Sequence, residues 1–426
     1  MSAFIDSFHT DPTLVFLIGR SISALAGTIS IGFSYAIGRR LFGTRSGLFG
    51  ALFLASAPMA VRHSCLIRTD ALALSLILAA VYLSLRYLKE GRGWGWAAAF
   101  LVGLATATKY TSLMALAPVL VAGLWAPGPG PRLRRVLLLP LAAAAGLFVG
   151  APYVVLDAPA AWADLVKQWE MAVRPYSYLS PGSKAIWYLT QVIPTAFGSS
   201  LIPILALAGL FFLRISRRTS AVLFCFPLFY LALVLSSRYN RFSRYMLYLL
   251  PFICLLAGLC LDRALAWISL SRRPAALVAV GLGLLVVFPS LEGVSQLDIW
   301  GNRIDLRTTA QQWMESHIPD GAAIAYETGC PLLHHRNTGN WELLNLKAQS
   351  VASRPLEHYR EAGINYLLLC RRSRLRTWKA AMPTRRRRRF KKVYAEIDRL
   401  PLLASFGDQT WSKIEVYELQ PVPAQE

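Results

Sequence analysis

Residues 62–70, with the sequence RHSCLIRTD, carry two arginines, a histidine and an aspartate between two long apolar runs. Acids are scarce around them, because from residue 13 to residue 163 the chain holds only Asp70, Glu90 and Asp157. Ionised groups beside hydrocarbon are costly unless they are paired, hydrated or bound to a ligand. The segment is therefore a candidate site for an anionic ligand.

Asp70 is the strongest candidate in this segment for a catalytic or metal-binding role. It opens an apolar run, so its simplest role is to stabilise the N-terminus of a helix, with Thr69 as the rival cap. The functional alternative is that Asp70 orients an acceptor hydroxyl or binds a divalent metal ion such as Mg²⁺ or Mn²⁺. The sequence leaves both roles open.

Three further turns between apolar runs carry polar side chains that could join the same site. Guanidinium forks and lysine ammonium groups satisfy the oxygens of a phosphate or pyrophosphate, so a basic pocket of this kind suits the headgroup of a lipid-linked phosphate. The alternative is that arginines at helix ends reach toward lipid phosphates without a catalytic role. The candidate site residues are Arg62, His63, Arg68, Asp70, Lys109, Tyr110, Asp157, Arg238, Arg241, Arg244 and Tyr245.

The elements that must position these residues are membrane helices. The chain of 426 residues is 55% hydrophobic and 16% charged, and apolar runs of the length that crosses a bilayer recur through its first two-thirds. We predict an α-helical polytopic bundle of about ten helices over residues 13–291, after an N-terminal stub at 1–12 that does not resemble a signal peptide. The ten runs are 13–37, 46–62, 70–88, 94–108, 110–127, 136–156, 187–213, 219–237, 245–262 and 274–291.

Loop charges predict the topology. If the run from residue 94 to 127 is broken near Lys109, alternate loops separate into one set with fifteen basic residues and two acids, and another with nine basic residues and four acids. The positive-inside rule places the first set in the cytoplasm and the candidate site, the N-terminus and the C-terminal domain outside. The net charge of +22 thus indicates topology signals and contact with anionic lipid rather than nucleic acid.

The longest outer loop covers residues 157–185. Trp162, Leu165, Val166, Trp169 and Val173 follow helical spacing on one stripe within it. Two interpretations fit this pattern: a helix in the membrane interface, or a helix packed against the bundle.

Residues 292–426 predict a small external α/β domain. We expect a helix over residues 305–319 with Trp313 and Ile318 inward, and buried strands at 322–327 and 365–370. The basic segment 371–392 is either a solvated loop or a contact for anionic headgroups. Cys330 and Cys370 could pair if this domain lies outside the cell, whereas the other four cysteines fall in or beside apolar runs and resemble packing residues.

The order of several segments resembles the GT-C glycosyltransferases, and in particular bacterial relatives of dolichyl-phosphate-mannose protein mannosyltransferases and lipid A aminoarabinose transferases. The resemblance extends over nearly the whole chain and includes the tail, DLRTTAQQWMESHIPDG. The other segments are GRSISALAGTISIGFSYAIGRRLFGTRSGLFGALFLASAPMAVRHSCLIRTDALA, GLATATKYTSLMAL, APYVVLDAPAAWADLVKQW and RYMLYLLPF.

This resemblance implies an enzyme that moves a sugar from a polyprenyl-phosphate carrier to a lipid, glycan or protein acceptor on the outer side of the plasma membrane. It also implies that Asp70 acts in the site or with a divalent ion, and that Lys109 and Arg244 meet the carrier phosphate or brace its pocket. The family's presumed catalytic acid lies in a first external loop after a first helix, and Asp6 and Asp11 do not match that motif. By this resemblance the chain begins about where the family's second helix begins and lacks the first helix and first external loop. A misassigned start, a fragment or a loss of activity would each explain this departure.

Two rival functions remain. A lipid-linked-sugar binder or flippase-like transporter would carry a similar basic pocket, although the apolar runs lack the midplane polar residues and internal repeats typical of transporters. A structural subunit of another transferase would tolerate the replacement of Asp70 by Asn.

Overall fold

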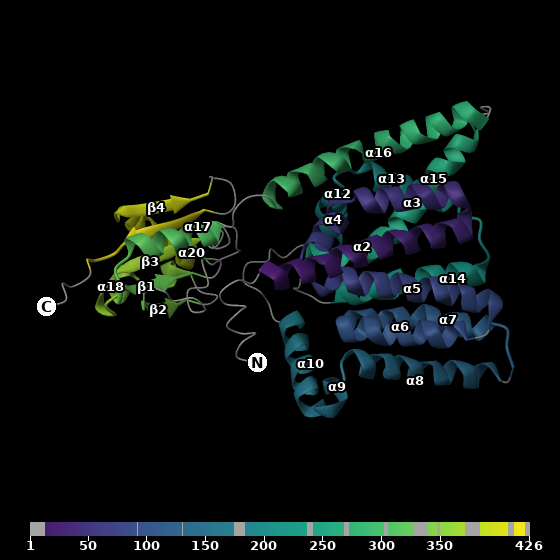
Figure 1. The fold of residues 1–426 in the computed structure, drawn as a ribbon, viewed down its shortest axis with the longest axis horizontal. Helices are drawn as coiled ribbons and strands as arrows, with labels where there is room; N and C mark the ends of the chain where they lie inside the picture. Colours follow the sequence, from purple (N-terminus) through teal and green to yellow (C-terminus); the bar gives the residue numbers. More distant parts are fainter. Residues whose placement is uncertain are drawn as a thin grey trace. The chain divides into compact units, whose positions relative to one another are not determined.

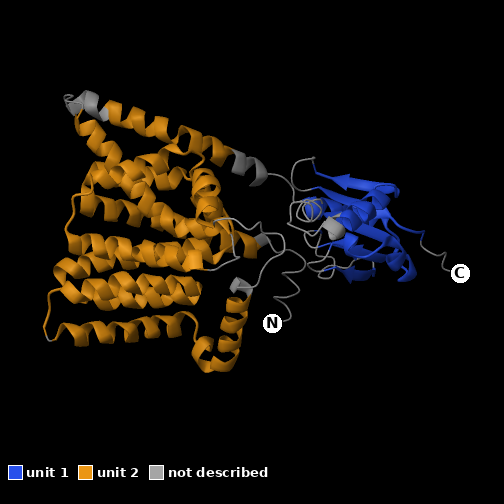
Figure 2. Ribbon diagram, turned by 180° about the vertical axis from the view of Figure 1, so that it is seen from behind, with its two compact units in different colours: residues 1–11, 175–181, 300–426 blue, residues 12–174, 182–299 orange. Residues whose placement is uncertain are grey.

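The computed structural model describes most of the chain, and the description below is confined to that part (Figure 1). The described ranges are 13–91, 93–129, 131–173, 184–236, 242–267, 272–301, 306–327, 330, 340–346, 350–370, 384–407 and 413–421. The chain divides into two compact units, a helical unit over residues 12–174 and 182–299 and a second unit that includes residues 300–426 (Figure 2).

The helical unit is a bundle. Its first half contains α2 (Thr13–Phe42), α3 (Thr44–Ser56), α4 (Pro58–Cys65), α5 (Thr69–Glu90), α6 (Trp94–Thr108), η1 (Tyr110–Ala115), α7 (Leu116–Trp125), α8 (Arg132–Gly150), α9 (Tyr153–Leu156) and α10 (Ala158–Val173). Its second half contains α11 (Lys184–Trp187), η2 (Tyr188–Val192), α12 (Ile193–Phe197), α13 (Leu201–Phe211), α14 (Arg217–Ser236), η3 (Ser243–Leu249), α15 (Leu250–Trp267) and α16 (Arg272–Gly301).

All ten predicted apolar runs form helices, but they are not ten equivalent spans. Among the described residues, six helices are long and apolar enough to cross a membrane, with two shorter apolar helices over residues 94–108 and 110–125. The expected single run 187–213 is instead bent by 108° between residues 197 and 201. Gly198, in the left-handed conformation at φ 65°, ends α12 there, and hydropathy alone does not report such a backbone break.

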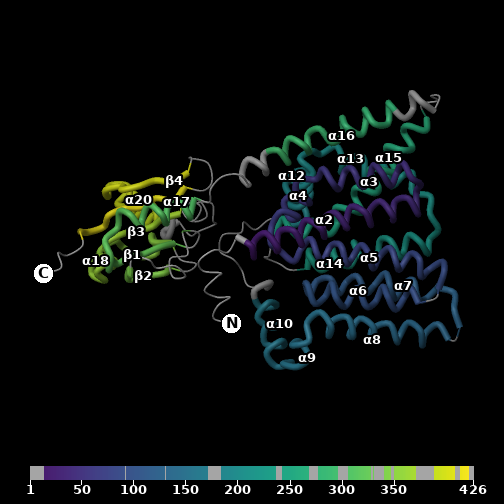
Figure 3. The backbone as a smooth tube through the Cα atoms, in the orientation of Figure 1, coloured from purple at the N-terminus to yellow at the C-terminus, as the bar shows by residue number. Residues whose placement is uncertain are grey.

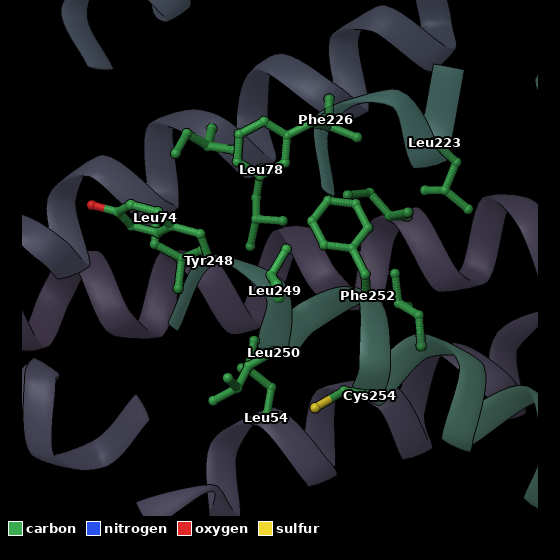
Figure 4. Close-up of a cluster of buried hydrophobic side chains, with 14 of the residues drawn as sticks. Leu54, Leu74, Leu78, Leu223, Phe226, Tyr248, Leu249, Leu250, Phe252 and Cys254 are labelled. Atoms are coloured by element: carbon green, nitrogen blue, oxygen red, sulfur yellow. The ribbon is translucent and has the colours of Figure 1, made fainter. Parts of the chain in front are cut away.

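The core of the bundle surrounds α5 and α15, the two candidate spans with the largest buried fraction. Leucines of α5 meet Phe226 of α14 and the residues where η3 passes into α15, as the close-up in Figure 4 shows. A helix that is apolar on all sides is expected in the interior of a bundle. Because α5 and η3 also carry candidate site residues, this core fixes the positions of both.

The two ends of α5 carry different ionic groups. At its C-terminal end Glu90 accepts hydrogen bonds from Arg40 at 2.8 Å and from Arg86 at 2.7 Å, so residues that loop charge assigns to the cytoplasmic side do lie together. Asp262, the second acid on the side that loop charge assigns to the cytoplasm, accepts a hydrogen bond from Ser46 at 2.7 Å. Asp70 is at the opposite end of α5.

Helix α10 turns away from the bundle axis after α8 and α9 (Figure 3). Trp162 and Trp169 are 68% and 66% exposed, and Val166 is exposed beside them. Leu165 of the same stripe is half-buried. The exposure of the two tryptophans favours the interfacial interpretation over packing on the bundle.

The second unit contains a five-stranded mixed sheet in the order β2-β1-β3-β5-β4. Strand β1 is parallel to both β2 and β3, and β5 is antiparallel to β3 and β4. Apolar clusters cover both faces of the sheet. The elements are α17 (Leu306–His317), β1 (Ala323–Tyr326), β2 (Glu342–Asn345), η5 (Val351–Ser353), α18 (Leu356–Glu361), β3 (Tyr366–Cys370), α20 (Thr384–Ile397), β4 (Leu402–Phe406) and β5 (Ile414–Glu418).

The predicted helix and both predicted strands of this unit are confirmed as α17, β1 and β3, with Ile318 buried and Trp313 half-buried. The basic segment 371–392 differs from the expected loop. Residues 371–383 lie outside the described part, but residues from 384 onward begin α20, which buries Phe390 and Tyr394. Apolar residues at helical spacing among the arginines explain this helix.

Helices α6 and α8 pack through facing glycines. A Cβ added at Gly103 would lie 2.0 Å from the carbonyl oxygen of Ala143, and one added at Gly146 would lie 2.1 Å from that of Phe100. Small residues allow two membrane helices to approach at backbone distance.

We expect Gly103→Ala to destabilise the bundle by about 1–3 kcal/mol, because a methyl group overfills this contact. Gly32→Ala is the matched control, since a Cβ at Gly32 meets nothing within 4 Å and alanine favours the helix. Thermal unfolding in detergent measures both, and equal midpoints for the two variants would contradict the close packing.

Candidate functional site

Asp70 lies in the first turn of α5, but it pairs with other helices. Arg68 is the N-cap residue and no side chain caps this helix, so neither Thr69 nor Asp70 acts as the expected cap. The Asp70 side chain is 6% exposed, and its Oδ1 accepts a hydrogen bond from Nζ of Lys109 at 2.6 Å. Its Oδ2 lies 3.7 Å from Nδ1 of His63, on α4. Three elements thus converge on one carboxylate.

Lys109 lies at the break that loop charge predicted. Helix α6 ends at Thr108, Lys109 is extended at φ −160° and ψ 121°, and the chain continues as the 3₁₀ helix η1. The Lys109 ammonium lies 4.9 Å from the ring centroid of Tyr248 and 5.5 Å from that of Tyr245. Aromatic faces attract a cation at these distances, so the carboxylate and the two rings hold the ammonium together.

Cationic residues of α4, α5 and η3 surround this pair. The charge of Arg244 acts on both Asp70 and Lys109, and its guanidinium lies 4.7 Å from the ring centroid of Phe242. Arg62 and Arg68 are exposed, and their charges act on His63. The structure therefore brings together Arg62, His63, Arg68, Asp70, Lys109, Arg244 and Tyr245.

Other candidates are placed differently. Asp157 is exposed, and its Oδ1 accepts a hydrogen bond from the backbone N–H of Ala160 at 3.3 Å, which suits a cap for α10. Within the described ranges it has no contact with Asp70. Tyr110 follows Lys109 but is 44% exposed. Arg238 and Arg241 lie outside the described residues.

Several buried polar atoms near the pair lack a hydrogen-bond partner among the residues that the structure describes. Buried polar groups are normally paired, and an unpaired group indicates a place for water or a ligand. The atoms are His63 Nδ1, Thr111 Oγ1, Ser112 Oγ, Arg244 Nε and the hydroxyl of Tyr230.

Tyr230 and Tyr248 were not predicted as site residues. Tyr248 faces Lys109, and the rings of Tyr230 and Tyr248 make an edge contact at 5.3 Å. The available signal was the spacing of three residues between Tyr245 and Tyr248 in RYMLYLLPF, which puts both rings on one side of a 3₁₀ helix.

The donor set around Asp70 does not fit a divalent metal ion on its own. In the part of the chain that is described, no three His, Cys, Asp or Glu side chains come together. A lysine ammonium occupies Oδ1 of Asp70 and further cations surround it, whereas Mg²⁺ and Mn²⁺ prefer several oxygen ligands. We therefore derive no step through a metal.

An apolar groove adjoins the cluster. It has a volume of about 210 Å³ and is lined by residues of α2, α3, α4, α5 and η3, including Leu54, Ala60, His63, Cys65 and Leu247. His63 belongs to both the groove and the cluster, so an apolar chain in the groove could lead directly to a charged headgroup.

The site and fold define a polytopic membrane protein with a cationic cluster beside an apolar groove. Residues 16–155 match the family model for dolichyl-phosphate-mannose-protein mannosyltransferase. No match is found among curated protein sequences.

Among solved structures, ArnT from Cupriavidus metallidurans bound to undecaprenyl phosphate matches with a TM-score of 0.53 and 16% identity, covering 98% of this chain and 88% of that one. The apo state of the same protein matches with a TM-score of 0.51 and 15% identity, over 97% and 87%. AglB from Archaeoglobus fulgidus, in complex with an inhibitory peptide and a dolichol-phosphate, has a TM-score of 0.46 and 13% identity, over 82% and 58%. A third of the chain thus matches a mannosyltransferase family model, and the fold over nearly the whole chain is similar to that of ArnT.

We expect Lys109→Met to destabilise the bundle by about 3–5 kcal/mol, because it leaves a buried carboxylate without its partner. The double variant Asp70→Asn/Lys109→Met should lose less than the sum of the two single variants. Unfolding titrations in detergent measure this cycle.

Glu90→Gln provides the matched control, since Glu90 and Arg86 are both more than a quarter exposed and such pairs contribute about 1 kcal/mol or less. An additive cycle at Asp70 and Lys109 would show that this pair does not hold the two helices together.

Proposed function

We propose that the protein is a membrane glycosyltransferase that moves a sugar from a polyprenyl-phosphate carrier to a lipid, glycan or protein acceptor. The observation that carries this proposal is the gathering of cations around one acid, beside an apolar groove, in a GT-C fold. The charges of Lys109 and Arg244 act on the Asp70 carboxylate, and those of Arg62 and Arg68 act on the adjacent His63, so the cluster retains an excess of positive charge.

A phosphate headgroup meets this excess directly. Arg244 has a buried Nε without a hydrogen-bond partner among the described residues, and guanidinium groups bind phosphate oxygens through paired N–H donors. Lys109 supplies a compact charge that the nearby rings hold in place. We assign the phosphate contacts to these two residues, with Arg62 and Arg68 at the exposed edge.

The groove supports a carrier with an apolar chain. Its volume of about 210 Å³ accommodates only the isoprene units next to the phosphate, so the rest of the chain would lie in the bilayer. The structure of ArnT holds undecaprenyl phosphate, and this relative supports the same class of carrier here.

In the proposed reaction the bond between the anomeric carbon and the phosphate oxygen breaks, and its electron pair stays on the phosphate. The acceptor oxygen bonds to the anomeric carbon, and its proton passes to a base. Lys109 and Arg244 stabilise the charge that develops on the phosphate. Asp70 braces Lys109 through Oδ1, and we propose Oδ2 as the acceptor of the proton.

The proposed site faces outward, as does the C-terminal unit, in a multi-pass plasma membrane protein. The loop charges support this orientation, as does the gathering of Arg40, Arg86 and Glu90 at the other end of α5. In the C-terminal unit, exposed Arg388 and Lys391 on α20 support contact with anionic lipid headgroups.

Cys65 provides a direct test of carrier binding, since it is exposed and lines the groove. We expect undecaprenyl phosphate to slow the reaction of Cys65 with a maleimide in the detergent-solubilised protein, whereas the uncharged alcohol undecaprenol protects much less. Cys65→Ser identifies the labelled residue. Equal protection by both lipids would remove the phosphate from the proposed binding mode.

Transfer kinetics separate the roles of Lys109 and Asp70. With radiolabelled polyprenyl-phosphate sugars, Lys109→Met should raise KM for the donor about 10- to 100-fold, the cost of one charged hydrogen bond. Asp70→Asn should lower kcat about 100- to 10,000-fold, as expected for a lost general base, with less effect on KM.

Identical effects of the two variants on kcat and KM would show that Asp70 only braces Lys109. Protection of Cys65 without transfer, across a panel of donors and acceptors, would instead identify a lipid-phosphate binder or transporter.

A further inference from the structure

Two cysteines of the C-terminal unit meet at one edge of its sheet. Strands β1 and β3 are parallel neighbours, with Tyr326 opposite Leu368, so their carboxyl ends lie side by side. Cys370 is the last residue of β3. Cys330 lies at the same edge, where its backbone N–H donates to the carbonyl of Glu327 at 3.2 Å.

The two thiols lie against each other. The Cys330 thiol is within hydrogen-bonding contact of the Cys370 thiol, and its Sγ also lies 3.4 Å from the carbonyl oxygen of Leu368. Cys330 is 2% exposed and Cys370 is 5% exposed. The other four cysteines lie on α4, α14 and α15 of the helical unit.

Glu327 holds the backbone at both cysteines. Its N–H donates to the carbonyl of Leu368 at 3.1 Å, and its carbonyl accepts from Cys330. Its Oε2 accepts from the N–H of Cys370 at 3.2 Å, while Oε1 accepts from the Ser350 hydroxyl at 2.9 Å and from the N–H of Val351 at 3.0 Å. One fully buried side chain thus fixes the separation of the two strand ends.

The two thiols share a buried site with one carboxyl group. Burial raises the pKa of the Glu327 carboxyl to about 7, and burial together with the adjacent Cys370 thiol raises the pKa of Cys330 well above its ordinary value. Three titratable groups therefore share one dry site. A disulfide would remove two of them and leave an apolar bridge beside the carboxyl group.

We propose that Cys330 and Cys370 form a disulfide that joins the ends of β1 and β3. This rests on the outward placement of the C-terminal unit in the proposed function, because such bonds persist in oxidising compartments. The S–S bond replaces two S–H bonds, and two protons leave. The two electrons reduce a disulfide-bearing oxidant, protein or small molecule, to its dithiol by exchange through a mixed disulfide.

Thiol counting tests the bond in the full chain. Membranes are quenched in acid, denatured and treated with a maleimide that adds a fixed mass to each free thiol. With six cysteines in the chain, we expect four adducts before reduction and six after it. The wild-type count needs no variant, so a variant that fails to fold does not affect the test.

Two single variants identify the pair. Cys330→Ser and Cys370→Ser should each give five adducts both before and after reduction, whereas Cys65→Ser should give three before and five after. A linked peptide two hydrogens lighter than its separate parts would confirm the assignment. Six adducts before reduction would overturn the proposal, as would a bond that persists in Cys330→Ser.

The count is independent of sugar transfer. If the pair is oxidised in a protein without transferase activity, the disulfide proposal holds and the proposed function fails. If the pair is reduced in an active transferase, only the disulfide proposal fails.

Discussion

The contact between Asp70 and Lys109 is the interaction on which the rest of the site depends. It joins the start of α5 to the break after α6. Moving two charges out of water costs free energy, so such a pair is stable only where further groups interact with both partners. Here His63 lies on one side of the carboxylate, and two tyrosine rings face the ammonium. One acid cannot neutralise the remaining arginines, and that imbalance is what an anionic headgroup would correct.

The other end of α5 shows how the same chemistry looks when it is balanced. Glu90 forms ion pairs with Arg40 and Arg86, and all three side chains are about a quarter exposed. Water and lipid phosphate can therefore supply the hydrogen bonds that these side chains still lack. The cluster near Asp70 differs in the burial of its acid, since the Asp70 side chain is 6% exposed whereas that of Glu90 is 28% exposed.

The ionic residues that the structure brings together could be recognised in the sequence. Charged residues are so scarce in the apolar runs that Asp70, Lys109 and Arg244 could be recognised from their types and the loop in which each lies. Tyr230 and Tyr248 could not, since tyrosines are ordinary at membrane interfaces and only the fold shows which ones turn inward. Asp157 was grouped with the site on its position after an apolar run, yet it caps α10. The bend at Gly198 depends on a backbone angle, which hydropathy does not encode.

The short 3₁₀ segment η3 has a consequence for how this part of the chain can vary. With three residues per turn, side chains three positions apart are eclipsed, which lets Tyr245 and Tyr248 both face Lys109. One inserted or deleted residue would rotate everything beyond it by about 120°, carrying one ring to the opposite side of the segment. Another aromatic residue could therefore replace either tyrosine, whereas the spacing of three residues between the two positions must be kept.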